Sequence, residues 1–139
     1  MFRKLLVAND GSKGGEQALA SALALAKRLD VGLAMVCVEE AARFPASIDE
    51  VTAAMAEATG AFDAVVAAAK AQAEAAGVAL EPHVVVGHPV SAIVELIQRG
   101  GYDLLVVGYM GHSALYNRMI GGAASRLVAL APCQVLVVK

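Results

Sequence analysis

Four glycines in the last third of the chain have a spacing that suits the binding of an anion. Two residues separate Gly108 from Gly111, and nine separate Gly111 from the pair Gly121 and Gly122. Glycine lets the backbone approach a ligand closely, and free amides at the start of a helix attract anions. A phosphate chain lying across both turns would use these features. The same glycines also fit a sharp turn followed by an ordinary helix start, so the spacing alone leaves both interpretations open.

Five short apolar runs are expected to form the strands that position these glycines. They are Leu5–Ala8, Leu33–Val38, Val84–Val86, Leu104–Val107 and Val135–Val138. Each run is continuously apolar rather than alternating, which is typical of parallel strands that are buried on both faces.

Helical periodicity fills most of the sequence between these runs. The expected helices cover Ala18–Leu29, Val51–Ala76, Pro89–Gly100 and about Gly122–Ala131. Strands that alternate with helices predict right-handed βαβ crossovers and a doubly wound parallel sheet. The segment Glu39–Asp49 has little periodicity and is expected to be a mobile surface loop. We expect residues 1–139 to form a single domain, because no linker or repeat interrupts the pattern.

The composition excludes several classes of partner. The formal net charge is −2, which gives no basic surplus for binding nucleic acid. No apolar stretch is long enough to cross a membrane, and the N-terminus lacks the features of a signal peptide, so a cytoplasmic location is expected. Cys37 and Cys133 are then expected to be buried free thiols.

The carboxyl ends of the strands are where an open parallel sheet binds its ligands, at the point where the strand order reverses. Asn9 and Asp10 follow the first run, Val38 and Glu39 end the second, and residues 108–113 follow the fourth. Asp10 also suits a turn or cap before the first helix. For Glu39 and its neighbour Glu40, a solvated loop is the expected setting.

Motifs for the common catalytic and metal sites are missing from the sequence. It contains no Walker A motif, no dinucleotide-binding Gly-x-Gly-x-x-Gly and no Gly-x-Ser-x-Gly nucleophile elbow. His83, His88 and His112 are not spaced as metal ligands with a cysteine or carboxylate. We therefore predict neither a catalytic constellation nor a metal site built by the protein alone.

The chain resembles the universal stress protein family over essentially its whole length. The likeness is carried by four segments in order, which are Lys4–Ser12, Val86–Ile93, Tyr102–Gly108 and Ala131–Val138. They are similar to the family's first strand with its Asp-Gly-Ser turn, its Gly-x-Pro segment, its Ala-Asp-Leu-Ile-Val-x-Gly strand and its Ala-Pro-Cys-Pro-Val-Leu-Val-Val ending. The resemblance implies a flavodoxin-like, three-layer α/β/α sandwich whose five-stranded parallel sheet has the order 3-2-1-4-5.

The resemblance also implies a homodimer made through the last strand. The apolar run Val135–Val138 agrees with this, because an uncovered apolar edge strand invites pairing.

ATP-binding members of that family carry Gly-x2-Gly-x9-Gly followed by Ser or Thr. Gly108, Gly111 and Gly121 match this pattern, but Gly122 stands where the hydroxyl residue is expected. The missing hydrogen bond to a charged phosphate is worth about 1–3 kcal/mol, or roughly a tenfold to hundredfold loss of affinity. The backbone amides of Gly121, Gly122 and Ala123 would remain available.

Further site residues follow from the same resemblance. It implies that Asp10 lies beside the adenine or the ribose, that Val38 lines the adenine pocket, and that Val107 and Met110 flank the first glycine turn. Asn9 either contacts the base or closes an Asx turn.

Arg118 either reaches a phosphate, with which a guanidinium forms paired hydrogen bonds, or is solvated. A Mg²⁺ ion could accompany the phosphates of ATP, because such ions take most of their ligands from phosphate and water.

The leading hypothesis is a cytoplasmic universal stress protein that binds ATP or a related adenine nucleotide. One alternative is a dimeric member that binds no nucleotide and acts through protein partners, which Gly122 would favour. A second is a slow nucleotide hydrolase, for which Asp10 would have to serve as the general base.

Overall fold

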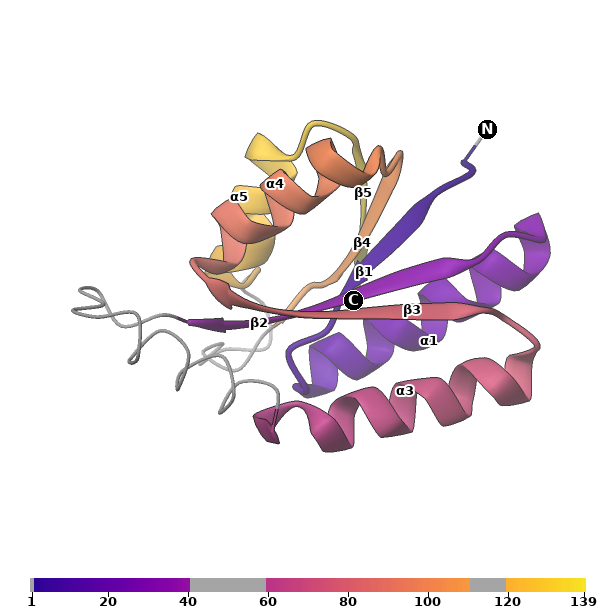
Figure 1. The fold of residues 1–139 in the computed structure, drawn as a ribbon. Helices are drawn as coiled ribbons and strands as arrows, with labels where there is room; N and C mark the ends of the chain where they lie inside the picture. Colours follow the sequence, from indigo (N-terminus) through magenta and orange to yellow (C-terminus); the bar gives the residue numbers. More distant parts are fainter. Residues whose placement is uncertain (1, 41–59, 111–119) are drawn as a thin grey trace.

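The computed structural model describes residues 2–40, 60–110 and 120–139. Strands and helices alternate along these residues (Figure 1). In chain order they are β1 (Leu5–Ala8), α1 (Lys13–Leu29), β2 (Leu33–Glu40), α3 (Asp63–Ala76), β3 (Leu80–Gly87), α4 (Pro89–Gly100), β4 (Leu104–Gly108), α5 (Gly122–Leu130) and β5 (Gln134–Val138). The strands form one parallel sheet of order β3-β2-β1-β4-β5, which confirms the predicted topology.

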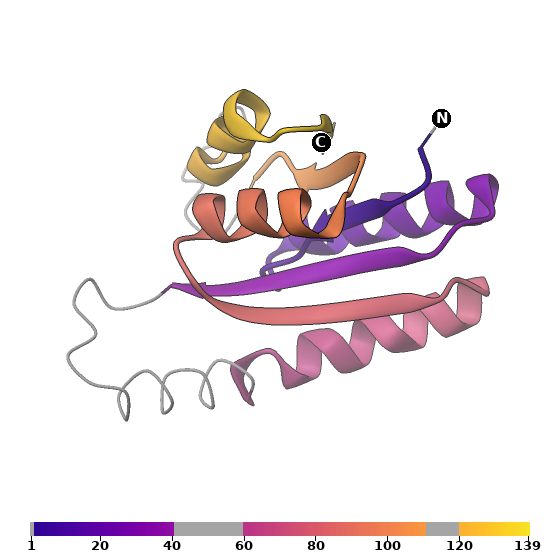
Figure 2. The same ribbon diagram turned by 45° about the horizontal axis from the view of Figure 1, so that its top comes forward.

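The helices cover both faces of the sheet (Figures 1 and 2). On one face, α1 and α3 pack on a core that includes Leu5, Val7 and Met35. On the other face, α4 and α5 pack on a core that includes Leu6 and Leu105. Successive residues of β1 thus enter opposite cores, as the period of a strand requires. The three-layer α/β/α sandwich is confirmed.

Helix α1 begins at Lys13 rather than at the predicted Ala18. Its N-cap is Ser12, whose Oγ accepts a hydrogen bond from the amide of Gly15 at 3.1 Å. The apolar periodicity begins only at Ala18, so the first turn carries no periodic signal and the cap decides where the helix starts.

Strand β3 is longer than predicted. It begins at Leu80 and contains Pro82. A proline removes one ladder hydrogen bond and is tolerated on an edge strand, and β3 is an edge of this sheet. Its partner β2 is longer too. Glu39 pairs with Val86 and Glu40 with Gly87, so the prediction that the loop begins at Glu39 is wrong. The rest of the predicted loop, residues 41–49, lies outside the described residues.

The remaining helix predictions agree with the structure at most described residues, but the predicted helix Val51–Ala76 is interrupted at Phe62, the N-cap of α3, which begins at Asp63. Helix α4 begins at Pro89 and ends at Gly100, and α3 ends at Ala76, all as predicted. Residues 51–59 of the long second predicted helix lie outside the described residues. Among the helices of the described part of the chain, none has the length and apolarity needed to span a membrane.

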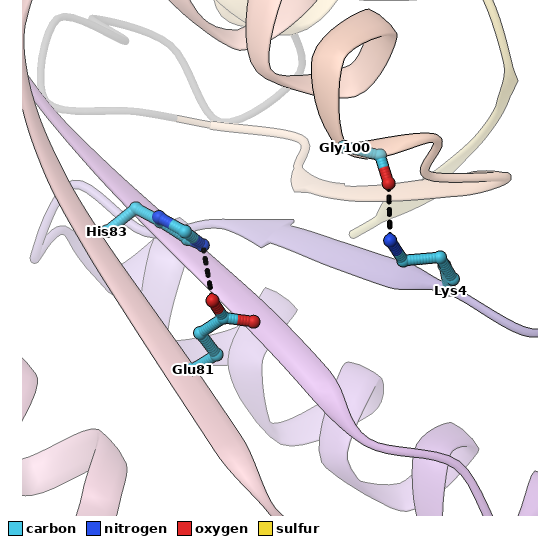
Figure 3. Close-up of polar contacts among 4 residues, drawn as sticks. All are labelled: Lys4, Glu81, His83 and Gly100. Carbon is cyan, nitrogen blue, oxygen red and sulfur yellow. Dashed lines mark hydrogen bonds and ion pairs between the residues drawn. The ribbon is translucent and has the colours of Figure 1, made fainter.

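The amino ends of the strands are held by polar contacts. The carboxylate of Asp103 accepts hydrogen bonds from the backbone amides of Arg3 and Lys4, at 2.9 and 3.1 Å. Lys4 Nζ donates to the carbonyl of Gly100, which joins the chain before β1 to the end of α4 (Figure 3). On β3, His83 Nε2 lies 3.6 Å from Glu81 Oε1 (Figure 3). The contacts of Asp103 and Lys4 hold the chain before β1 to the start of β4 and to the end of α4, at the end of the sheet opposite the predicted site.

Both cysteines are free, as predicted, but their surroundings differ. Cys37, on β2, is fully buried, and Cys133 is only half-buried, so the expectation that both are buried holds for Cys37 alone. Burial, with a smaller contribution from the carboxylate of Asp10, raises the pKa of the Cys37 thiol to about 11. Cys37 is therefore a neutral, apolar core residue at physiological pH.

Candidate nucleotide-binding cavity

A cavity of about 590 Å³ lies at the carboxyl ends of β1, β2 and β4. Its volume is within the range of roughly 300–1,000 Å³ that is usual for small-molecule sites. The position is the one that the strand order predicts, because the order in which successive strands are added to the sheet reverses between β1 and β4.

One wall of the cavity is apolar. It combines β1, β2 and β4 with helices α4 and α5, and its residues are Ala8, Val36, Val38, Pro89, Ile93, Val107, Ala124 and Leu127. Ile93 and Leu127 are anchored in the core on the α4–α5 side of the sheet. Phe62 borders the opposite side of the cavity, next to α3. An apolar wall of this kind suits the face of a planar ring.

The turn between β1 and α1 is built from two overlapping Asx turns. Asn9 Oδ1 accepts a hydrogen bond from the Gly11 amide at 3.0 Å, and Asp10 Oδ1 accepts one from the Ser12 amide at 3.0 Å. Gly11 has a φ of 81°, which a residue with a side chain would adopt only under strain. Side chains and glycine together thus fix the path of the chain beside the cavity.

The side chain of Asn9 closes the first of these two turns. The residue is buried, and its Nδ2 lies 3.6 Å from the sulfur of Met35, in the core on the α1–α3 side. The structure thus shows the Asx turn, one of the two roles left open for Asn9, and it places Asn9 in the lining of the cavity.

Asp10 is exposed and lines the cavity. Its Oδ1 also accepts a hydrogen bond from the hydroxyl of Ser12, the N-cap of α1. Both roles considered for Asp10, a place in the turn and a place at the site, are compatible with this position. The general base of the hydrolase hypothesis would be a carboxylate whose Oδ1 already accepts hydrogen bonds from the amide and the hydroxyl of Ser12.

Close backbone packing explains three glycines around the cavity. A Cβ on Gly108 would overlap the backbone of Gly14, and a Cβ on Gly14 would overlap the carbonyl of Met110. A Cβ on Gly15 would lie 2.5 Å from Asn9 Oδ1. The glycine at 108 is therefore required by the contact between α1 and the end of β4, whatever ligand approaches it.

The start of α5 forms the polar end of the cavity. Gly121 is the N-cap, and its amide donates to the carbonyl of Tyr109 at 2.7 Å. The amides of Gly122, Ala123 and Ala124 belong to the first turn, where a helix offers them no acceptor of its own. These amides, with the positive end of the helix dipole, suit an anion.

Two carboxylates that were expected to lie in a solvated loop border the cavity. Glu39 and Glu40 end β2, and both line the cavity together with Asp10. Among the described residues, no group of three His, Cys, Asp or Glu side chains is arranged to hold a metal ion.

Nine predicted site residues line the cavity together, namely Asn9, Asp10, Val38, Val107, Gly108, Met110, Gly121, Gly122 and Ala123. Gly111 and Arg118, like His112, lie outside the described residues. Sequence reasoning missed Val36 and Ile93, among others. The two-residue strand period places Val36 on the same face as Val38, and the apolar face of the helix after Pro89 contains Ile93, so both signals were present.

The model of the universal stress protein family matches residues 1–139. The chain belongs to the universal stress protein family. A universal stress protein of Bacillus subtilis, YxiE, is 31% identical over 151 residues, and the match covers the full length of both chains.

Solved structures of family members have the same fold. The chain is similar to the universal stress protein UspA from Lactobacillus plantarum, with a TM-score of 0.85, 25% identity and coverage of 99% of this chain and 98% of the other. A universal stress protein in complex with cAMP gives a TM-score of 0.75 with 27% identity, covering 99% of this chain and 97% of that one.

Proposed function

We propose that this universal stress protein binds an adenine nucleotide, ATP or a relative of it, in the cavity at the strand ends. The observation that carries the proposal is the pairing of an apolar wall with the first turn of α5 in one cavity. A similar family member is solved with cAMP, an adenine nucleotide. Two free thiols suit the reducing cytoplasm, where we propose that the protein acts as a nucleotide-responsive module.

The chemistry of the cavity suggests how a nucleotide would lie in it. The adenine ring would pack on the apolar wall near Val38, and the phosphate would accept hydrogen bonds from the amides of Gly122 and Ala123. The ribose hydroxyls would lie near Asp10, since a carboxylate accepts hydrogen bonds from hydroxyl groups. In this orientation the ribose hydroxyls meet an acceptor of the protein, and the anionic end of the ligand meets the helix start.

A Mg²⁺ ion that accompanied ATP would take its ligands mainly from phosphate and water.

A charge placed at the start of α5 tests the proposal. In Ala123→Asp, an exposed residue of the cavity becomes negative, which leaves the helix stable but repels a phosphate. Ser125→Asp adds the same charge to an exposed position of α5 that does not line the cavity. We expect the first variant to lose AMP and ATP binding in calorimetry and the second to retain it. Equal binding by both variants would refute the proposed site.

We further propose that the protein forms a homodimer through β5. Among the described residues, this strand is an edge of the sheet and pairs with β4 alone. Leu136 on β5 is 40% exposed, and on the adjoining α5 Val128 and Leu130 are 52% and 60% exposed. A second copy pairing along β5 would satisfy the open edge and cover these side chains. Sedimentation should give a dimer for the wild type and a monomer for Leu136→Lys, and an unchanged mass in that variant would argue against this interface.

A further inference from the structure

We propose that the carboxylate of Glu40 contacts the edge of the base and makes the cavity selective for a base that carries an amino group on that edge, as adenine does. This role rests on the proposed nucleotide binding, and it specifies which base the site prefers.

The residues of β2 alternate between the two faces of the sheet up to the last position of the strand. Cys37 belongs to the core on the α1–α3 side, whereas Val36 and Val38 belong to the α4–α5 side. Glu40 still pairs with Gly87 of β3, so the strand remains regular at this residue. Glu40 therefore follows Val36 and Val38 on the α4–α5 side, and all three residues line the cavity.

The order of the strands gives the direction in which the nucleotide would lie. In the proposed orientation the phosphate is at the start of α5, the ribose is beside Asp10 after β1, and the base packs on Val38 of β2. Since β2 lies on the side of β1 away from β4, the base directs the edge remote from its sugar toward the outer end of β2. Glu40 lies two residues beyond Val38, about 6.6 Å further along the strand. Its carboxylate is thus within reach of the edge of a ring packed on Val38.

The chemistry of a carboxylate determines which base edge it accepts. An ionised carboxylate accepts hydrogen bonds and donates none. The amino group of adenine is a donor, and carboxylates pair with the amino groups of bases in nucleic-acid complexes. Hypoxanthine carries a carbonyl group in the same position, so it presents an acceptor to Glu40, and the two oxygens repel each other. The preference for adenine therefore follows from the sign of one interaction.

Glu39 provides a matched comparison on the same strand. It also lines the cavity, but it precedes Glu40 by one residue and so belongs to the opposite face of the sheet. Removal of either charge changes the electrostatic potential at the phosphate equally for two nucleotides that differ only in the base. The ratio of their two affinities therefore responds only to a residue that contacts the base.

The test is calorimetric titration of nucleotide-free protein with AMP and with inosine monophosphate (IMP). IMP differs from AMP only in the base, where a carbonyl replaces the amino group and the neighbouring ring nitrogen carries a proton. The variants are Glu40→Gln and, as the control, Glu39→Gln. Glutamine has nearly the shape of glutamate, but its amide can both donate and accept hydrogen bonds.

We expect the wild type to bind IMP about tenfold more weakly than AMP, because a hydrogen bond to a charged acceptor is lost. Glu40→Gln should remove most of this difference, chiefly by gaining affinity for IMP, since the amide can donate to the carbonyl. Glu39→Gln should retain the wild-type ratio.

The possible results separate the role of Glu40 from the function on which it rests. Wild-type protein that binds IMP as tightly as AMP would overturn the base preference while leaving the nucleotide site in place. A wild-type ratio in Glu40→Gln, or a ratio that changes only in Glu39→Gln, would overturn the role of Glu40. Wild-type protein that binds neither nucleotide would overturn the proposed function, and the base preference with it.

Discussion

The backbone of Gly14, in the first turn of α1, lies so close to Gly108 at the end of β4 that Gly108 has no room for a Cβ, and a Cβ on Gly14 would overlap the carbonyl of Met110. This contact joins the two segments that flank the topological switch point, and it brings the β1–α1 turn beside the end of β4. The shape of the cavity between them therefore depends on two residues without side chains.

Substitution of Gly108 by alanine should destabilise the fold. The added methyl group would overlap the Gly14 carbonyl, and overpacking of this kind costs about 1–3 kcal/mol. Urea unfolding measures the loss. The control is Gly122→Ala, because nothing lies within 4 Å of a Cβ at that position. If both variants unfolded at the wild-type urea concentration, the close approach of α1 to β4 would be wrong.

Removal of the cap of α1 should also lower stability. Ser12→Ala deletes the oxygen that accepts from the Gly15 amide, and loss of such a cap costs about 0.5–2 kcal/mol. Ser125→Ala removes a hydroxyl from an exposed position inside α5 and should cost nothing measurable. An equal effect of the two substitutions on the free energy of unfolding would show that Ser12 is not a cap.

Introduction of the hydroxyl that nucleotide-binding relatives carry should strengthen nucleotide binding. Position 122 has open space for a side chain at the start of α5, so Gly122→Ser can direct its hydroxyl at a phosphate. A hydrogen bond to a charged acceptor is worth about 1.5–3 kcal/mol, so the affinity for AMP should rise about tenfold or more. Gly122→Ala adds bulk without the hydroxyl and should not show this gain; a gain of the same size in both variants would exclude a hydrogen bond as its cause.

Alkaline pH should destabilise the protein through Cys37. Its folded pKa is raised from 9.0 to about 11 by burial and by Asp10. Between these values the unfolded chain loses the thiol proton and the folded chain keeps it, so the folded state binds more protons and stability falls as pH rises.

The measurement is the free energy of unfolding between pH 8 and about 11. Cys37→Ala should flatten the decline, and Cys133→Ala serves as the comparison, since the pKa of this less buried thiol is also raised by burial. A decline of unchanged slope in Cys37→Ala would rule out Cys37 as its source.

Much of the fold was predictable because its strands are continuously apolar and its helices carry periodic signals. The boundaries that failed depend on interactions without such a signal. The start of α1 is set by the Ser12 cap, and the ends of β2 and β3 are set by mutual pairing, which draws Glu39 and Pro82 into the sheet.

The site residues at strand ends and glycine turns were predictable from the sequence. The partners of these residues were less predictable, because three-dimensional packing determines them. The side chain of Asn9 turns to the core below the sheet, toward Met35. The amide of Gly121 is paired with Tyr109, and the glycine at 108 is required by Gly14. No spacing rule could have revealed these partners, because each contact joins segments that are distant in sequence or depends on the local path of the chain.

The central claim is that an adenine nucleotide occupies the cavity at the ends of β1, β2 and β4. The most direct measurement is an NMR titration of isotopically labelled, nucleotide-free protein with AMP, which follows each backbone amide. We predict saturable shifts for Val38, beside the base, and for Gly122 and Ala123, beside the phosphate. Amides of the cavity that stay unchanged at millimolar AMP, or shifts confined to residues outside it, would contradict the claim.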